Sequence, residues 1–124
     1  MFDHEKLKVF FRGEIVDFDK ATISVANTGL LYGLGVFTGI RAHYNKEADA
    51  LYVFRLQEHF ERLRFSCKLC NYETFLTQYD YQRFSQIIKD LFSINKIRED
   101  SYIRVTNLVM KIEFCRSSSI IKIV

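Results

Sequence analysis

The sequence predicts an α+β fold in which an antiparallel sheet has two helices packed on one face. Two amphipathic stretches, near residues 56–70 and 81–95, predict the helices. Strand-like runs precede these helices and follow them, an order typical of α+β domains. The chain has 124 residues, enough for a modest core, so we expect residues 1–124 to form a single domain.

The predicted strands before the helices follow from short apolar or β-branched runs and the turns between them. Residues 8–18 predict two strands that turn near Arg12 and Gly13. The β-branched run at 22–25 predicts a further strand, and the glycine-containing residues 26–34 predict a loop. Strands over 35–44 and 50–54 flank a polar turn, which predicts a hairpin.

The two helices are predicted from the spacing of their apolar side chains. In the first helix, steps of four and three place these side chains on one face: Leu56, Phe60, Leu63, Cys67 and Cys70. In the second, the same kind of repeat joins Phe84, Ile87, Ile88 and Leu91. Asp80 is predicted to be the N-cap of this helix. Two further strands are predicted after the helix, over residues 101–112 and 119–124.

Composition and charge exclude several classes of protein. The chain is 48% hydrophobic and has 12 Phe and 7 Tyr, so it can bury a core. Its net charge is +3, and the charged residues are scattered along the chain. The sequence therefore lacks the basic patch that is typical of a nucleic-acid-binding protein. No apolar run reaches the roughly 18 residues of a membrane span, and the charged start does not fit a signal peptide. We expect a cytoplasmic protein without nucleic-acid or membrane partners.

The three cysteines, Cys67, Cys70 and Cys115, are an odd number in a chain without an export signal, which predicts reduced thiols. Cys67 and Cys70 form a C-x-x-C motif, but zinc sites pair such a motif with a second one or with spaced histidines. The sequence has neither. Because both cysteines continue the apolar stripe of the first helix, we expect them in the core and predict no metal site.

Residues 32–41, YGLGVFTGIR, combine three glycines with one phenylalanine and one arginine. Glycine weakens a strand and often marks a position where another group comes close. In an extended chain one face presents Gly35, Phe37, Gly39, Arg41 and His43. This face of bare backbone, one aromatic ring and one cation suits an anionic small molecule. The same spacing also fits a sharp bend or close strand packing.

Two further arginines allow a binding role and a simpler structural role. Arg62 lies beside the buried stripe of the first helix, and a guanidinium group can bind phosphate oxygens through two parallel hydrogen bonds. The alternative is an ion pair with Glu58, one turn earlier. Arg104 shares a strand face with Tyr102, which suits a carboxylate but equally a solvated surface. Arg41 has the same ambiguity.

Four segments of the chain resemble the N-terminal small domain of the fold-type IV pyridoxal-phosphate aminotransferases, also called class IV. They are RGEIVDFDKATISV at 12–25, GLLYGLGVFTGIRAH at 29–43, YVFRLQEHFERLRFS at 52–66 and SINKIREDSYIR at 93–104. The GIR ending of the second segment favours the branched-chain amino-acid aminotransferases. D-amino-acid aminotransferases and aminodeoxychorismate lyases of the same fold type are similar as well.

The resemblance implies a reaction and a set of binding residues. The reaction is amino-group transfer between leucine, isoleucine or valine and 2-oxoglutarate. Arg62 is implied to anchor the phosphate of pyridoxal phosphate. The residues implied to contact the amino acid or 2-oxo acid are Tyr32, Phe37, Gly39, Arg41, Tyr102 and Arg104. Tyr32 matches a residue that reaches into the neighbouring subunit, so a homodimer is implied.

The chain also departs from the family pattern. Thr38 stands where the family usually has glutamate, and no proline follows Arg104. No lysine matches the family's Schiff-base lysine, which belongs to a larger C-terminal catalytic domain. We therefore expect no catalytic residue here, weak or no cofactor binding by this chain alone, and no activity by itself. The chain fits a fragment, a truncated product or an excised domain. The alternative function is a non-catalytic binding or dimerisation module.

Overall fold

The computed structural model describes residues 6–109, 112–116 and 119–123, with side chains through Val109. In these ranges the strands form three antiparallel sheets. Strand β1 (Lys8–Phe11) pairs with β2 (Glu14–Asp17), and β6 (Ile112–Arg116) pairs with β7 (Ser119–Ile123). The central sheet has the order β4 (Ala50–Val53), β3 (Gly35–Asn45), β5 (Ser101–Leu108). The long strand β3 is therefore the middle strand of the sheet that carries the candidate site.

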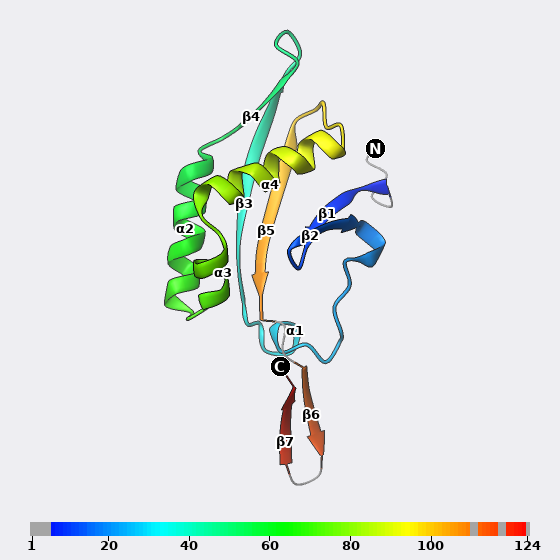
Figure 1. The fold of residues 1–124 in the computed structure, drawn as a ribbon, viewed down its shortest axis with the longest axis vertical. Coiled ribbons are helices and arrows are strands. Elements are labelled where there is room, and N and C mark those ends of the chain that lie inside the picture. The colour runs from blue at the N-terminus through cyan, green and yellow to red at the C-terminus, as the bar shows by residue number, and fades with distance from the viewer. Residues whose placement is uncertain (1–5, 110–111, 117–118, 124) are drawn as a thin grey trace.

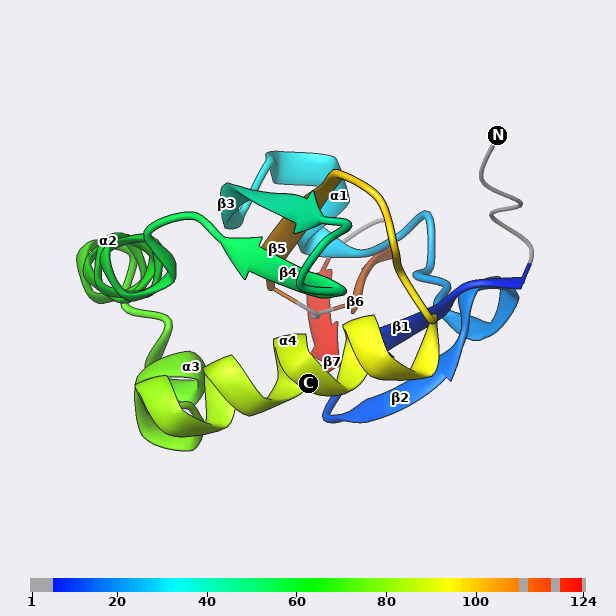
Figure 2. The same cartoon turned by 90° about the horizontal axis from the view of Figure 1, so that it is seen from above.

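Three helices cover one side of this central sheet, as Figures 1 and 2 show. They are α2 (Leu56–Leu69), α3 (Glu73–Gln78) and α4 (Tyr81–Ile94). The short helix α1 (Thr28–Tyr32) lies on the opposite side in Figure 2, and the 3-10 turn η2 (Phe18–Lys20) follows β2. The predicted α+β class, with helices on one face of an antiparallel sheet, is confirmed.

The hydrophobic core lies between the central sheet and these helices. Its buried members come from β3, α2, α3 and α4: Ile40, Phe60, Leu63, Cys67, Phe75, Phe84 and Ile88. Alternation along β3 turns the even-numbered side chains toward the helices and leaves the odd-numbered ones on the open side. The predicted stripes of α2 and α4 thus supply most of the core.

The turn between β1 and β2 has the geometry predicted for Arg12 and Gly13. Both residues have positive φ, 52° and 90°. Two-residue hairpin loops with positive φ at both positions match the right-handed twist of the flanking strands, and glycine adopts that conformation without steric cost. The side chain of Asn95 then joins this hairpin to α4. It accepts from the Lys8 N–H at 2.8 Å and donates to the Lys8 carbonyl at 2.9 Å.

The secondary structure differs from the prediction in four places. Residues 22–25 form no strand, because the hydroxyl and carbonyl of Ser24 accept from the next backbone N–H groups and close a turn. The predicted loop at 26–34 contains α1, whose start is capped by the side chain of Asn27. Helix α3 was not predicted, since six residues are too few to show a period. The strand predicted over 101–112 ends at Leu108, and β6 begins at Ile112.

Candidate functional site

Five of the predicted substrate-binding residues lie on one open face of the central sheet. Strand alternation places Phe37, Gly39 and Arg41 on the side of β3 that faces away from the helices. The antiparallel register sets Gly39 opposite Arg104 and Arg41 opposite Tyr102 on β5. The predicted shared face of β3 is therefore confirmed, and β5 adds a second row of side chains to it.

Close contacts order the side chains of this open face. The Arg104 guanidinium lies over the Phe37 ring, 4.2 Å from its centroid, which is a cation–π contact. The Tyr102 ring covers Gly39 so closely that a Cβ on Gly39 would collide with the phenol. The group that comes close to Gly39 is therefore the Tyr102 side chain of the same protein. The result is an exposed surface of two aromatic rings and two cations, including Arg41.

Replacing Gly39 with alanine should move Tyr102 without unfolding the chain. The new methyl group would occupy the space of the phenol, and Tyr102 is 64% exposed, so its side chain can swing outward. We expect the free energy of unfolding to change by less than about 1 kcal/mol. Nuclear Overhauser contacts from the Tyr102 ring to residue 39 should disappear. Persistence of those contacts would contradict the placement of Tyr102.

Arg62 lies on the other face of β3, where α2 packs. One of its terminal nitrogens, Nη2, donates to Oγ1 of Thr38 at 2.6 Å. The alternative partner, Glu58, is instead paired with Arg55, whose Nε lies 3.0 Å from Oε1 of Glu58. Within the described residues no carboxylate pairs with Arg62. The alternative prediction, an ion pair between Arg62 and Glu58, is therefore wrong. Arg62 is exposed to solvent.

The two faces of β3 meet at one of its edges. Strand β4 pairs with β3 only over residues 42–45, while β5 pairs with the opposite edge over residues 35–42. In the described part of the chain no strand pairs with the edge of β3 beside residues 35–40, which we call the free edge, whereas at Arg41 the carbonyl accepts from the Phe54 N–H at 2.8 Å. Helix α2 packs against this strand. The Arg62 side and the open face therefore lie on the two sides of this free edge.

Tyr32 lies apart from the other candidates. It is the last residue of α1 and is 63% exposed. The described chain contains no hydrogen bond from its hydroxyl. An exposed phenol at a helix end is available to contact another chain or domain.

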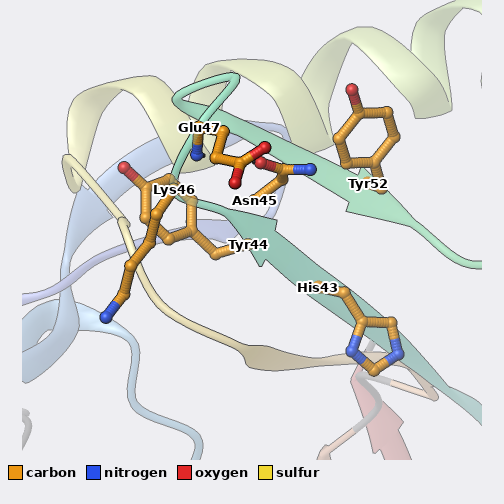
Figure 3. A pocket seen from close by; sticks show the side chains of 6 residues that line it. All are labelled: His43, Tyr44, Asn45, Lys46, Glu47 and Tyr52. Carbon is orange, nitrogen blue, oxygen red and sulfur yellow. Dashed lines mark hydrogen bonds between the residues drawn. The ribbon is translucent and has the colours of Figure 1, made fainter.

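A pocket lies elsewhere, at the β3–β4 hairpin. It has a volume of about 560 Å³ and is lined by His43, Tyr44, Asn45, Lys46, Glu47 and Tyr52. Figure 3 shows these side chains spread along the hairpin instead of converging on one point. Nδ1 of His43 also lies 3.5 Å from Oδ2 of Asp100. This hollow contains none of the residues predicted to bind cofactor or substrate, and of the predicted β3 face it contains only His43.

The prediction for the cysteines is confirmed for Cys67 and wrong for Cys70. Cys67 is fully buried, and this burial raises the pKa of its thiol, with a hydrogen bond from Asn107 as the opposing effect. Such a thiol stays protonated and is a poor nucleophile or metal ligand. Cys70 is exposed because α2 ends at Leu69, so its side chain no longer follows the stripe. The side chain of Cys115 lies outside the described residues.

The described residues contain neither a cluster of metal-binding side chains nor a helix that could span a membrane. Residues 6–109, 112–116 and 119–123 contain no group of three or more His, Cys, Asp or Glu side chains arranged to hold a metal ion. No helix in the same ranges is long and apolar enough to cross a membrane.

Two residues of the Arg62 region, Thr38 and His59, were not predicted as site residues from the sequence. Thr38 is 1% exposed, and its hydroxyl lies within hydrogen-bond distance of both Arg62 and His59. A threonine at a core-facing position of a strand was the available indication, because a buried hydroxyl requires partners.

The chain is similar to known aminotransferases in sequence and in structure. A probable branched-chain-amino-acid aminotransferase from Aquifex aeolicus is 37% identical over 95 residues, which cover 77% of this chain and 30% of that protein. The structure of a branched-chain aminotransferase from Thermoproteus uzoniensis with norvaline has a TM-score of 0.75 and 33% identity, and the match covers 94% of this chain and 40% of that one.

The structure of a branched-chain amino acid aminotransferase from Escherichia coli has a TM-score of 0.71 and 28% identity. That match covers 85% of this chain and 34% of the solved chain. No protein-family model matches the sequence. The chain spans 30% and 31% of the length of the curated relatives from Aquifex aeolicus and Methanocaldococcus jannaschii.

The fold and these similarities define the class of the domain. The chain corresponds to the N-terminal small domain of the fold-type IV pyridoxal-phosphate aminotransferases. Within that class it is most like the branched-chain amino-acid aminotransferases, which are its homologues in sequence and its neighbours in structure.

Proposed function

We propose that residues 1–124 are one domain, the N-terminal domain of a branched-chain amino-acid aminotransferase. The complete enzyme transfers the amino group between leucine, isoleucine or valine and 2-oxoglutarate, with pyridoxal phosphate as its cofactor. It works as a homodimer in the cytoplasm, and the catalytic domain lies outside these residues. The observation that carries the proposal is the Arg62 guanidinium, which is exposed and, in the described chain, held by Thr38 without a carboxylate partner.

Arg62 fits the phosphate of pyridoxal phosphate. A guanidinium group matches the geometry of phosphate oxygens, and the donors that Thr38 does not occupy remain available. When bound, the cofactor supplies an electron sink for the reaction at the amino acid. This chain contributes the charge that binds and orients the phosphate at the free edge of β3.

The open face fits the amino acid or 2-oxo acid. Arg104 and Arg41 provide positive charge for a carboxylate, and Tyr102 adds a hydroxyl donor beside Gly39. The ring of Phe37, which is 54% exposed, supplies an apolar wall for an aliphatic side chain. Ligand sites commonly combine an apolar lining with a few polar groups in this way. Tyr32 would contact the neighbouring subunit of the homodimer.

The 124-residue chain alone should show no transamination of leucine with 2-oxoglutarate. Its sequence contains no lysine matching the Schiff-base position, and the cofactor needs a lysine to form that bond. Borohydride reduction in the presence of pyridoxal phosphate should give no stoichiometric pyridoxyl-lysine in the mass spectrum. A gene product that includes the larger domain should be active and should be modified at one lysine outside residues 1–124. Stoichiometric labelling of one lysine within these residues would contradict the proposal.

A further inference from the structure

The hydroxyl of Thr38 joins two side chains of α2 across the sheet–helix interface. Oγ1 of Thr38 lies 2.6 Å from Nη2 of Arg62 and 3.1 Å from Nδ1 of His59. Thr38 is 1% exposed and belongs to the row of β3 that faces the helices. A hydroxyl buried at such a position costs free energy unless it is hydrogen-bonded. These two contacts therefore account for a polar side chain in an otherwise apolar row.

A guanidinium group can only donate, so the oxygen of Thr38 accepts from Arg62. The second lone pair of this oxygen could also accept from a protonated Nδ1 of His59, but the buried hydroxyl hydrogen would then have no acceptor, because Thr38 has no other hydrogen-bond partner in the described chain. We therefore infer that the hydroxyl donates to Nδ1, which carries no proton in this arrangement.

This arrangement restrains Arg62 without neutralising it. Thr38 is uncharged, so it holds one corner of the guanidinium and leaves the positive charge uncompensated. A free arginine side chain loses rotamer freedom when it binds an anion, and a side chain that is already held loses less. In the described chain the remaining guanidinium donors have no protein partner, so they are available to an anion at the free edge of β3.

We propose that Thr38, with His59 behind it, positions Arg62 for binding phosphate. This inference rests on the proposed function, because it assumes that Arg62 anchors the phosphate of the cofactor. Thr38 itself does not touch the phosphate. Its role is to hold the guanidinium in the orientation in which two donors face the ligand.

The test compares variants of the natural gene product titrated with inorganic phosphate and followed by ¹⁵N NMR at the Arg62 Nε–H group. Thr38→Val keeps the shape of the side chain and removes the hydroxyl, so we expect phosphate affinity to fall about three- to tenfold. Thr38→Ser retains the hydroxyl and should bind within about twofold of the wild-type chain. Because valine suits a buried strand position, Thr38→Val should remain folded.

A matched control exists on the open face of the sheet. There Nε of Arg104 lies 3.4 Å from Oγ1 of Thr106, an exposed threonine–arginine pair. Thr106→Val should leave phosphate affinity at Arg62 unchanged. The imidazole ¹⁵N shifts of His59 add a readout independent of any ligand. In the wild-type chain these shifts should show that Nδ1 carries no proton. In Thr38→Val, which has no hydroxyl to donate, the proton should be distributed between Nδ1 and Nε2.

Each outcome bears on the inference. Unchanged phosphate affinity in Thr38→Val, or an unchanged His59 tautomer, would overturn the positioning role while leaving Arg62 as the anchor. An equal loss in Thr38→Val and Thr106→Val would also overturn it. If Arg62→Ala itself bound phosphate as well as the wild-type chain, the proposed function would fail, and Thr38 would have no anchor to position.

Discussion

Replacing Arg62 with alanine should lower the affinity for pyridoxal phosphate by about 10- to 100-fold. The variant loses charged hydrogen bonds to phosphate, which are worth about 1.5–3 kcal/mol, and alanine offers no substitute. Arg62→Lys should recover part of the affinity, because an ammonium group attracts phosphate but cannot form two parallel bonds. The measurement is a titration of the natural gene product with pyridoxal phosphate and, in parallel, with pyridoxal, which lacks the phosphate.

Two controls make this experiment specific to the phosphate. Arg62→Ala should leave the weak affinity for pyridoxal unchanged, because the lost contacts are to the phosphate alone. Arg104 lies on the other face of β3. Arg104→Ala should instead raise the apparent Michaelis constant for the amino acid or 2-oxo acid. A loss in Arg62→Ala that is equal for pyridoxal phosphate and pyridoxal would show that Arg62 acts on stability or shape and not as a phosphate anchor.

Replacing Leu63 with alanine should destabilise the fold by about 2–5 kcal/mol. Leu63 is 1% exposed and packs in the core between α2 and the central sheet, so its removal leaves a cavity as well as a loss of apolar burial. The matched control is Leu69→Ala at the end of the same helix. Leu69 is 68% exposed, and we expect a change within about 0.5 kcal/mol.

Urea denaturation, followed by far-ultraviolet circular dichroism, measures both variants. The midpoint should fall for Leu63→Ala with an unchanged slope, which indicates lost stability without a change in the surface exposed on unfolding. Equal shifts for the two leucines would contradict the assignment of the buried face of α2.

Periodicity in the sequence was sufficient to predict the long elements of the fold. Helices α2 and α4 each span 14 residues, enough turns for an apolar stripe to repeat. Helix α3 has six residues, of which only Phe75 is buried, so it shows no repeat. Helix α1 depends on the side-chain cap from Asn27 and follows a turn closed by Ser24, which are local hydrogen bonds that composition does not reveal.

The candidate site was predictable within a strand but not between elements. Alternation alone placed Phe37, Gly39 and Arg41 on one face. The Arg62 partner was not predictable in this way, because Thr38 lies 24 residues away in sequence. Helical spacing suggested Glu58 as the partner, whereas the structure pairs Glu58 with Arg55. Contacts between a strand and a helix depend on how the two elements pack. The periodicity of the sequence within one element does not reveal this packing.

The most direct test of the phosphate site is a ¹⁵N NMR spectrum of the arginine Nε–H groups of the natural gene product, recorded during a titration with pyridoxal phosphate. The Arg62 signal should shift most, and pyridoxal, which lacks the phosphate, should leave it in place. Arg83, whose guanidinium lies over the Tyr79 ring, provides an internal reference that should not shift. A largest shift at Arg104 or Arg41, with Arg62 unchanged, would contradict the assignment of the phosphate to the helix side of β3.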